Sequence, residues 1–256
     1  MSFHLNNQNI EEAWPPLISK LTTCGTESER QALISEMTSG TKPQIVSFLN
    51  AHACNLAAKN AEFHDILTNS DYLLRDGVGI ELHLLLRGRK PGINLNGTDL
   101  IPDIIAHVDS QGKGKISLYG TKFKHVTSAR EALANHNITV DIMDGFRPDE
   151  EYVERALASR PNLIILGMGM PKQEILSLKL RAELGTSSVL IVNGGAIIDF
   201  IAGSYPRAPN WIRRIRLESL YRLSHEPRRL WRRNIGSIKF LKRSVCSAWN
   251  DRNTQQ

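Results

Sequence analysis

Four β-branched runs, separated by stretches with helical patterning, place the strongest constraint on what this chain can fold into. The runs are ISLYG (116–120), VDIMDG (140–145), LIILGMG (163–169) and VLIVNGG (189–195). Each ends in glycine, and stretches such as 123–135 and 172–184 space their apolar residues as a helix does. This alternation predicts successive βα units and a parallel sheet. The near-continuous apolarity of LIIL and VLIV is typical of strands covered on both faces.

The first hundred residues extend the same pattern. They contain two further predicted strands, at 45–49 and 72–75, and two further predicted helices, over 53–67 and 79–86. We therefore expect two more βα units in the same sheet, with helices on both of its faces.

The pattern changes after Gly203, where Pro206 and Pro209 interrupt it and a basic helical region follows. We predict an α/β catalytic domain over residues 1–205 and a basic, amphipathic helical appendage over residues 206–256.

Charge is distributed unevenly along the chain. Between Arg207 and Arg243 there are twelve Lys and Arg residues against two acids, Glu218 and Glu226, a charge of +10. Because the whole chain carries +6, the remaining residues sum to −4. A mildly acidic body with a strongly basic segment predicts contact with a polyanion, either nucleic acid or an anionic lipid surface.

Cysteine usage and hydropathy exclude several classes of protein. Cys24, Cys54 and Cys246 are far apart and show no CxxC spacing, so the sequence suggests neither a disulfide framework nor a zinc site, and a reducing compartment fits. No stretch offers a signal-peptide core or the roughly 18 apolar residues of a membrane span. We expect a cytoplasmic protein unless something attaches it to a bilayer.

Polar residues and glycines follow the ends of the predicted strands, where ligands bind in open parallel sheets. They are Asn50, His52, Asp76, Gly77, Gly79, Gly120, Thr121, Asp144, Gly167, Gly169, Pro171, Lys172, Gln173, Glu174, Asn193, Gly194 and Gly195. The G-x-G in GMGMPKQE is weak evidence for a nucleotide, and tight turns would also need these glycines. Because the next strand ends in Asn193 rather than an acid, a dinucleotide site there is disfavoured.

The two carboxylates at strand ends each fit two roles. Gly120 and Asp144 end successive strands, at the spacing that lets a carboxylate accept hydrogen bonds from a ribose, but Asp144 equally fits a turn or helix cap. Asp76 could act as a general base, which needs a carboxylate in reach of a hydroxyl. Spacing alone favours Asp76 as the cap of the next helix. His52 fits a structural role equally well.

A series of ordered motifs resembles one known family, the WecG/TagA/CpsF glycosyltransferases, over about residues 45 to 245. The motifs are Asn50-Ala51, DGVG (76–79), NGTDL (96–100), GMGMPKQE (167–174), NGGAIIDFIAG (193–203), RAPNW (207–211) and LESLYRLSHEPRRLWRR (217–233). The resemblance implies a Rossmann-like fold. It also implies inverting, metal-independent transfer of a hexose from a UDP-sugar to a polyprenyl-diphosphate-linked sugar, in bacterial surface or exopolysaccharide biosynthesis. No cofactor is implied, since the UDP-sugar is a substrate.

The resemblance also implies roles for single residues. Asp76 takes the position of the catalytic base, and Gln173 matches a residue important for donor handling. Four arginines match residues thought to reach the diphosphate of donor or acceptor: Arg207, Arg222, Arg228 and Arg229. The predicted donor side comprises Asn50, His52, Asn96, Gly97, Asp99, Gly120, Asp144, Gly167, Lys172, Gln173, Glu174, Gly194 and Gly195.

One position departs from the family pattern. The teichoic-acid branch has an active-site threonine near the Asn-Ala motif, whose counterpart here is Ala53, with Cys54 beside it. The transferred sugar therefore stays open between N-acetylmannosamine, its uronic acid and glucose.

The basic appendage combines arginines with Trp211, Tyr221 and Trp231 at spacings that suit an amphipathic helix. We expect it to bind the anionic inner face of the cell membrane peripherally, although its apolar stripe could dock on the body or be shielded by homo-oligomerisation. A nucleic-acid-binding module is an alternative that leaves PKQE and DGVG unexplained. A nucleotide-dependent oxidoreductase is disfavoured because no glycine fingerprint follows residues 116–120.

Overall fold

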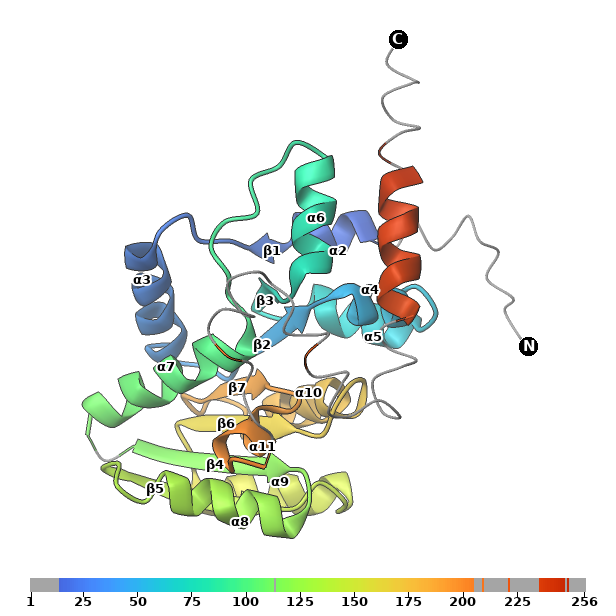
Figure 1. The fold of residues 1–256 in the computed structure, drawn as a ribbon. Coiled ribbons are helices and arrows are strands. Elements are labelled where there is room, and N and C mark those ends of the chain that lie inside the picture. Colours follow the sequence, from blue (N-terminus) through green and yellow to red (C-terminus); the bar gives the residue numbers. More distant parts are fainter. Residues whose placement is uncertain are drawn as a thin grey trace.

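The computed structural model describes residues 14–112, 114–204, 209, 221, 235–246 and 248. Seven parallel strands form one sheet in the order β1-β3-β2-β7-β6-β4-β5 (Figure 1). The strands are β1 (Leu21–Thr22), β2 (Gln44–Leu49), β3 (Tyr72–Arg75), β4 (Gly114–Gly120), β5 (Ile138–Met143), β6 (Leu163–Gly167) and β7 (Leu190–Asn193). The predicted parallel α/β sheet is confirmed.

Helices lie on both faces of this sheet, as predicted. They are α2 (Trp14–Ser19), α3 (Glu27–Thr38), α4 (Ala51–Ala57), α5 (Ala61–Thr68), α6 (Val78–Leu86), α7 (Gly97–Ser110), α8 (Phe123–Ala132), α9 (Asp149–Ser159), α10 (Lys172–Leu184) and α11 (Ile197–Ile201), with a further helix over 235–246. One core packs α3, α7, α8 and α11 against the sheet, and a second packs α9 and α10 against its opposite face.

The two cores explain why the central strands are apolar throughout. In β6, Leu163 and Ile165 belong to the core under α7 and α8, while Ile164 and Leu166 belong to the core under α9 and α10. All four side chains are 0% exposed. Because side chains alternate across a strand, a strand covered on both faces needs apolar residues at every position.

One predicted helix is wrong in extent. The stretch predicted as a single helix over 53–67 forms two helices, α4 and α5, with a break before Asn60. The Oδ1 atom of Asn60 accepts a hydrogen bond from the backbone N–H of Phe63 at 3.0 Å, which caps α5. This local side-chain bond satisfies a backbone donor at the new helix start and so stabilises the break.

The sheet order creates a switch point beside β4. Strand β4 pairs with β5 on one side and with β6 on the other, so the chain adds strands in opposite directions from this position. Since all strands are parallel, their carboxyl ends lie along one edge of the sheet. Ligands of open α/β folds bind at that edge.

The helix over 235–246 docks on the body beside α6 (Figure 1). Phe240 is fully buried, with its ring centroid 4.5 Å from that of Trp14. Ser244 Oγ lies 3.0 Å from His83 Nδ1. Burial lowers the pKa of His83 to about 4, so this histidine is neutral at pH 7. One segment of the predicted appendage therefore packs on the α/β body.

Most of the predicted appendage (206–256), including Arg207, Arg222, Arg228 and Arg229, lies outside the described residues. Within the part of the chain that the structure describes, no helix has the length and apolarity needed to cross a bilayer.

Candidate active site

Asp76 lies directly after β3, beside the residue that follows the neighbouring strand β2. Asn50 Nδ2 donates a hydrogen bond to Asp76 Oδ2 at 3.2 Å, and Asn50 Oδ1 accepts from the backbone N–H of Ala53 at 3.0 Å. The asparagine thus caps α4 and orients the carboxylate at the same time. Asn50 is 8% exposed, whereas Asp76 is only half-buried and reaches the surface.

Asp76 is not a helix cap, although spacing alone favoured that role. The N-cap of α6 is Gly77, which has φ 82° and supplies no side-chain capping bond. A positive φ is accessible to glycine at little cost, and it turns the chain between β3 and α6. Asp76 therefore precedes the cap, and its carboxylate lies at the sheet edge instead of on the helix N-terminus.

Ala53, the predicted counterpart of the family's threonine, and its neighbour Cys54 are both fully buried in the core that α4 forms with α2, α5 and α6. Burial raises the pKa of the Cys54 thiol far above its usual range, so the group stays protonated. His52 lies in the first turn of α4 and is half-buried.

Arg75 is the buried residue that precedes Asp76. Its side chain is 3% exposed and pairs with Glu81 on α6, with Nη1 and Oε2 3.1 Å apart. Its guanidinium also donates to the backbone oxygens of Pro91 and Ile93 at 3.1 and 3.0 Å. Arg75 thereby joins the end of β3 to the loop that leads into α7.

The NGTDL motif forms the start of α7. Asn96 Oδ1 accepts from the backbone N–H of Asp99 at 2.8 Å, and Asn96 Nδ2 donates to Asp99 Oδ2 at 3.0 Å. A Cβ atom on Gly97 would lie 3.3 Å from the ring of Phe48 in β2. The motif thus packs the first turn of α7 against the end of β2, and its predicted donor contacts stay predictions.

The loops after β4 and β6 interlock through backbone contacts. A Cβ atom on Gly120 would lie 2.4 Å from the backbone oxygen of Gly167, too close for any side chain. The N–H of Thr121 donates to that oxygen at 3.0 Å, and the N–H of Gly145 donates to Thr121 O at 2.8 Å. These glycines let three loops approach one another at the switch point.

The loop after β5 favours the turn role of Asp144. Its Oδ1 accepts from the backbone N–H of Phe146, and its Oδ2 accepts from Arg147 Nε, both at 3.1 Å. The Phe146 ring is 74% exposed. Lys172, at the start of α10, donates from Nζ to Gly145 O at 2.9 Å. Ribose binding by Asp144 stays a prediction.

One polar cluster at this edge was missed from the sequence. Thr121 Oγ1 donates to Asp199 Oδ1, and His125 Nδ1 lies 2.8 Å from the same oxygen. Asp199, on α11, is 7% exposed, and Thr121 has φ 50°. The sequence offered one indication, the position of Thr121 directly after Gly120 at the end of a strand. Its partner Asp199 lies 78 positions further along the chain. Spacing along the chain does not reveal such a pair.

Gln173 and Glu174 begin α10 and are 1% and 0% exposed. Gln173 Oε1 accepts from the backbone N–H groups of Gly169 and Gly195, each at 3.1 Å. Its Nε2 donates to Glu174 Oε1 at 2.8 Å. Burial raises the pKa of Glu174 to about 7. Both were predicted on the donor side, and in this structure they contact each other and the loops around the site.

The described part of the chain contains no group of three or more His, Cys, Asp and Glu side chains that could hold a metal ion. Metal-independent chemistry stays a prediction. Helices α6, α8 and α10 start at this edge without a side-chain capping bond. Their first backbone N–H groups can therefore interact with an anion. The edge combines a carboxylate that can accept a proton with helix starts that can stabilise negative charge.

Comparison with known proteins gives matches over most of the chain. A family model described as "Glycosyl transferase WecG/TagA/CpsF family" matches residues 18–254. An N-acetylglucosaminyldiphosphoundecaprenol N-acetyl-beta-D-mannosaminyltransferase of Bacillus subtilis (strain 168) is 28% identical over 200 residues, 77% of each chain. The protein of the same name from Staphylococcus aureus (strain MW2) is 29% identical over 211 residues, 77% of this chain and 73% of its own. The oxidoreductase and nucleic-acid alternatives gain no support from these matches.

Proposed function

Because the chain belongs to the WecG/TagA/CpsF family of glycosyltransferases, we propose that it moves a hexose from a UDP-sugar to a polyprenyl-diphosphate-linked sugar, with inversion and without a metal ion. The observation that carries this proposal is the Asn50–Asp76 pair, which holds a partly exposed carboxylate at the ligand-binding edge of the sheet. The names of the relatives favour N-acetylmannosamine over glucose as the sugar. A role in bacterial surface or exopolysaccharide biosynthesis follows from such an acceptor.

In this mechanism Asp76 removes the proton from the acceptor hydroxyl as that oxygen attacks the anomeric carbon. The bond from the anomeric carbon to the UDP oxygen breaks in the same step. Asn50 keeps one carboxylate oxygen in place, which leaves the other for the hydroxyl. UDP departs with added negative charge, which the uncapped starts of α8 and α10 stabilise. Arg207, Arg222, Arg228 and Arg229, outside the described residues, keep their predicted role toward a diphosphate.

We place the UDP part of the donor over the ends of β4, β5 and β6. The interlocked glycines there bring the loops that follow these strands together at the switch point. The exposed ring of Phe146 offers a face for a nucleobase, and Asp199 offers an acceptor for its N–H group or for a ribose hydroxyl. No cofactor takes part in this reaction.

The proposed reaction is tested by the release of UDP from several UDP-sugars, with a short-chain polyprenyl-diphosphate-linked N-acetylglucosamine as acceptor. We expect release only when donor and acceptor are both present, and we expect EDTA to leave the rate unchanged. Absence of release with every donor would contradict the transferase proposal. Loss of release in EDTA, with recovery on adding a divalent cation, would contradict metal independence alone.

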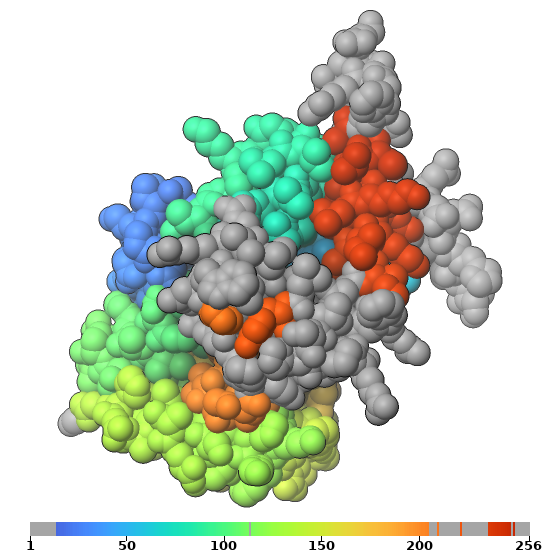
Figure 2. Space-filling view, viewed as in Figure 1, coloured from blue at the N-terminus to red at the C-terminus, as the bar shows by residue number. Residues whose placement is uncertain are grey.

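We also propose that the protein binds the membrane peripherally, and the described surface supports this. Helix α6 exposes Leu82 and Leu85, and the helix over 235–246 exposes Ile238 and Val245 on the side opposite its buried Phe240. Figure 2 shows the two helices side by side at the surface. Leucine and isoleucine exposed at successive turns of neighbouring helices form an apolar surface that a bilayer can cover.

Cations accompany these apolar side chains. Residues 82–93 and 235–246 contain no acid, and their cations are Arg87, Arg89, Lys90, Lys239, Lys242 and Arg243. A cationic rim around apolar residues complements the headgroups of anionic lipids. Because the N-cap of α6 is Gly77, directly after Asp76, this surface brings the candidate base near the bilayer where a lipid-linked acceptor resides.

Flotation with vesicles tests the membrane proposal. We expect the full chain to bind vesicles containing phosphatidylglycerol, and the double variant Leu85→Glu with Ile238→Glu to bind about tenfold more weakly, because it loses apolar contact and adds repulsion. Leu157→Glu, at an exposed position on α9, serves as the matched control and should bind like the unmodified chain. Equal recovery of the double variant and the control would contradict this surface.

A further inference from the structure

A single side-chain oxygen ties together the loops that follow β6 and β7. Gln173 Oε1 accepts from the backbone N–H of Gly169 in the first loop and of Gly195 in the second, each at 3.1 Å. Both glycines have positive φ, 81° and 61°, and a Cβ atom on either would touch nothing within 4 Å. Backbone conformation, not close packing, therefore demands glycine here, and glycine loops are intrinsically adaptable. The bridge from Gln173 restricts them.

This bridge requires one of the two orientations of the Gln173 amide. With the amide turned by 180°, its NH₂ group would meet two backbone N–H donors, and both hydrogen bonds would be lost. Glu174 adds a third contact that favours the same orientation, because its Oε1 accepts from Gln173 Nε2 at 2.8 Å. The ionised carboxyl can accept a hydrogen bond from the amide only when the NH₂ group points toward it.

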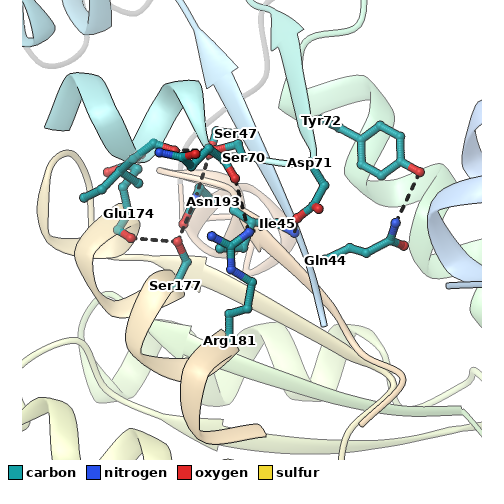
Figure 3. Close-up of polar contacts among 12 residues, drawn as sticks. Gln44, Ile45, Ser47, Ser70, Asp71, Tyr72, Glu174, Ser177, Arg181 and Asn193 are labelled. Atoms are coloured by element: carbon teal, nitrogen blue, oxygen red, sulfur yellow. Dashed lines mark hydrogen bonds and ion pairs between the residues drawn. The ribbon is translucent and has the colours of Figure 1, made fainter. Parts of the chain in front are cut away.

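The carboxyl of Glu174 is costly to bury. Its side chain is 0% exposed, and Oε2 has no hydrogen-bond partner among the described residues. Figure 3 shows Glu174 beside three buried polar residues that bond to one another: Ser177 on α10, Asn193 on β7 and Ser47 on β2. An apolar side chain would avoid the penalty of an unsatisfied buried oxygen. We therefore infer that Glu174 contributes by orienting the amide of Gln173, and not by stabilising the core.

We propose that Glu174 is a positioning residue for sugar transfer: it fixes the amide of Gln173 so that one oxygen clamps the two loops that border the donor. The expected effect on sugar transfer rests on the proposed function, because the clamped loops flank the glycines over which we place UDP. Glu174 itself touches no substrate.

An exchange of the two side chains tests the clamp. Glu174→Leu removes the acceptor and is expected to raise the KM for the donor about tenfold, the effect of one lost hydrogen bond, with kcat changed less. Gln173→Glu places two carboxyl groups side by side and should raise KM at least as much. Glu174→Gln retains an acceptor oxygen and should stay within about threefold of the unmodified enzyme. The exchanged pair, Gln173→Glu with Glu174→Gln, again places a hydrogen-bond acceptor beside a hydrogen-bond donor. Its KM for the UDP-sugar should return to within about threefold of the unmodified enzyme.

Failure of the exchanged pair to improve on Gln173→Glu would overturn the proposal, because it would mean that the amide itself contacts the donor. Glu183→Gln, exposed on the same helix, is the matched control.

A second readout needs no activity. In ¹⁵N-glycine spectra, the amide signals of Gly169 and Gly195 should shift in Glu174→Leu and return in Glu174→Gln. Unchanged signals in Glu174→Leu would overturn the clamp. If the unmodified chain releases no UDP, the proposed function fails, while these signals still decide whether Glu174 positions the loops.

Discussion

Asp76→Asn is expected to lower turnover by about 10²- to 10⁴-fold, the usual contribution of a general base. The substitution keeps the shape of the side chain and an oxygen that can accept from Asn50 Nδ2. It removes only the capacity to take a proton from the acceptor hydroxyl. We therefore expect the KM for the UDP-sugar to change little, since the amide still fits the same space. Initial rates of UDP release at saturating donor measure the effect.

A matched substitution separates chemistry from folding. Asp65, on α5, has a side chain that is 76% exposed and lies outside the site. Asp65→Asn removes the same charge and should leave both turnover and the urea midpoint unchanged. If Asp76→Asn retains near-normal turnover with an unchanged midpoint, Asp76 is not the base.

The position of Asp76 shows what residue spacing alone cannot predict. A carboxylate between a strand and a helix has two local uses, and capping is the commoner one. What removes the capping role is that Gly77 takes the cap position, and what orients the carboxylate is Asn50, at the end of a different strand. That second fact depends on the pairing of β2 with β3. Family resemblance supplied the assignment that spacing could not.

Strands were predicted more completely than helices for a physical reason. A strand covered on both faces is apolar at most positions, so β2, β3, β6 and β7 stand out as short apolar runs, although β2, β3 and β7 also contain the buried polar residues Ser47, Arg75 and Asn193. Helices α3 and α7 escaped prediction because tertiary contacts complete them. Arg30 on α3 is buried by its ion pair with Asp103 on α7, and Pro102 lies inside α7. The internal proline argues against a helix when only neighbours along the chain are considered, and the contact between Arg30 and Asp103 joins residues too far apart for spacing to reveal.

The polar network at the strand ends was equally hidden. Gln173 and Glu174 were assigned to the donor side because polar residues after a strand are usually exposed to ligand. Both are buried, since the loops after β6 and β7 fold over them. Only the three-dimensional arrangement shows that Gln173 is bonded to two loops that are far apart in the sequence.

Arg75→Met is expected to destabilise the fold by about 3–5 kcal/mol, because it breaks the buried ion pair between Arg75 and Glu81 by removing one member. Arg75 is 3% exposed, and Glu81 is 9% exposed at its side chain. The substitution also removes the donors to the carbonyl oxygens of Pro91 and Ile93, which hold the loop before α7. Urea unfolding followed by tryptophan fluorescence measures the free energy of unfolding.

Two further variants identify the cause of that loss. Arg155→Met removes an arginine that pairs with Asp141 but is 54% exposed, and should cost at most about 1 kcal/mol because water already screens the pair. Glu81→Leu in the Arg75→Met background removes the buried carboxylate that has lost its ion pair with Arg75, and should recover part of the stability. If the double variant is no more stable than Arg75→Met, the lost carbonyl contacts, not the buried carboxylate, account for the effect. In that case Arg75 acts chiefly by fixing the loop beside Asp76, and the turnover of Arg75→Met should fall with it even where the protein remains folded.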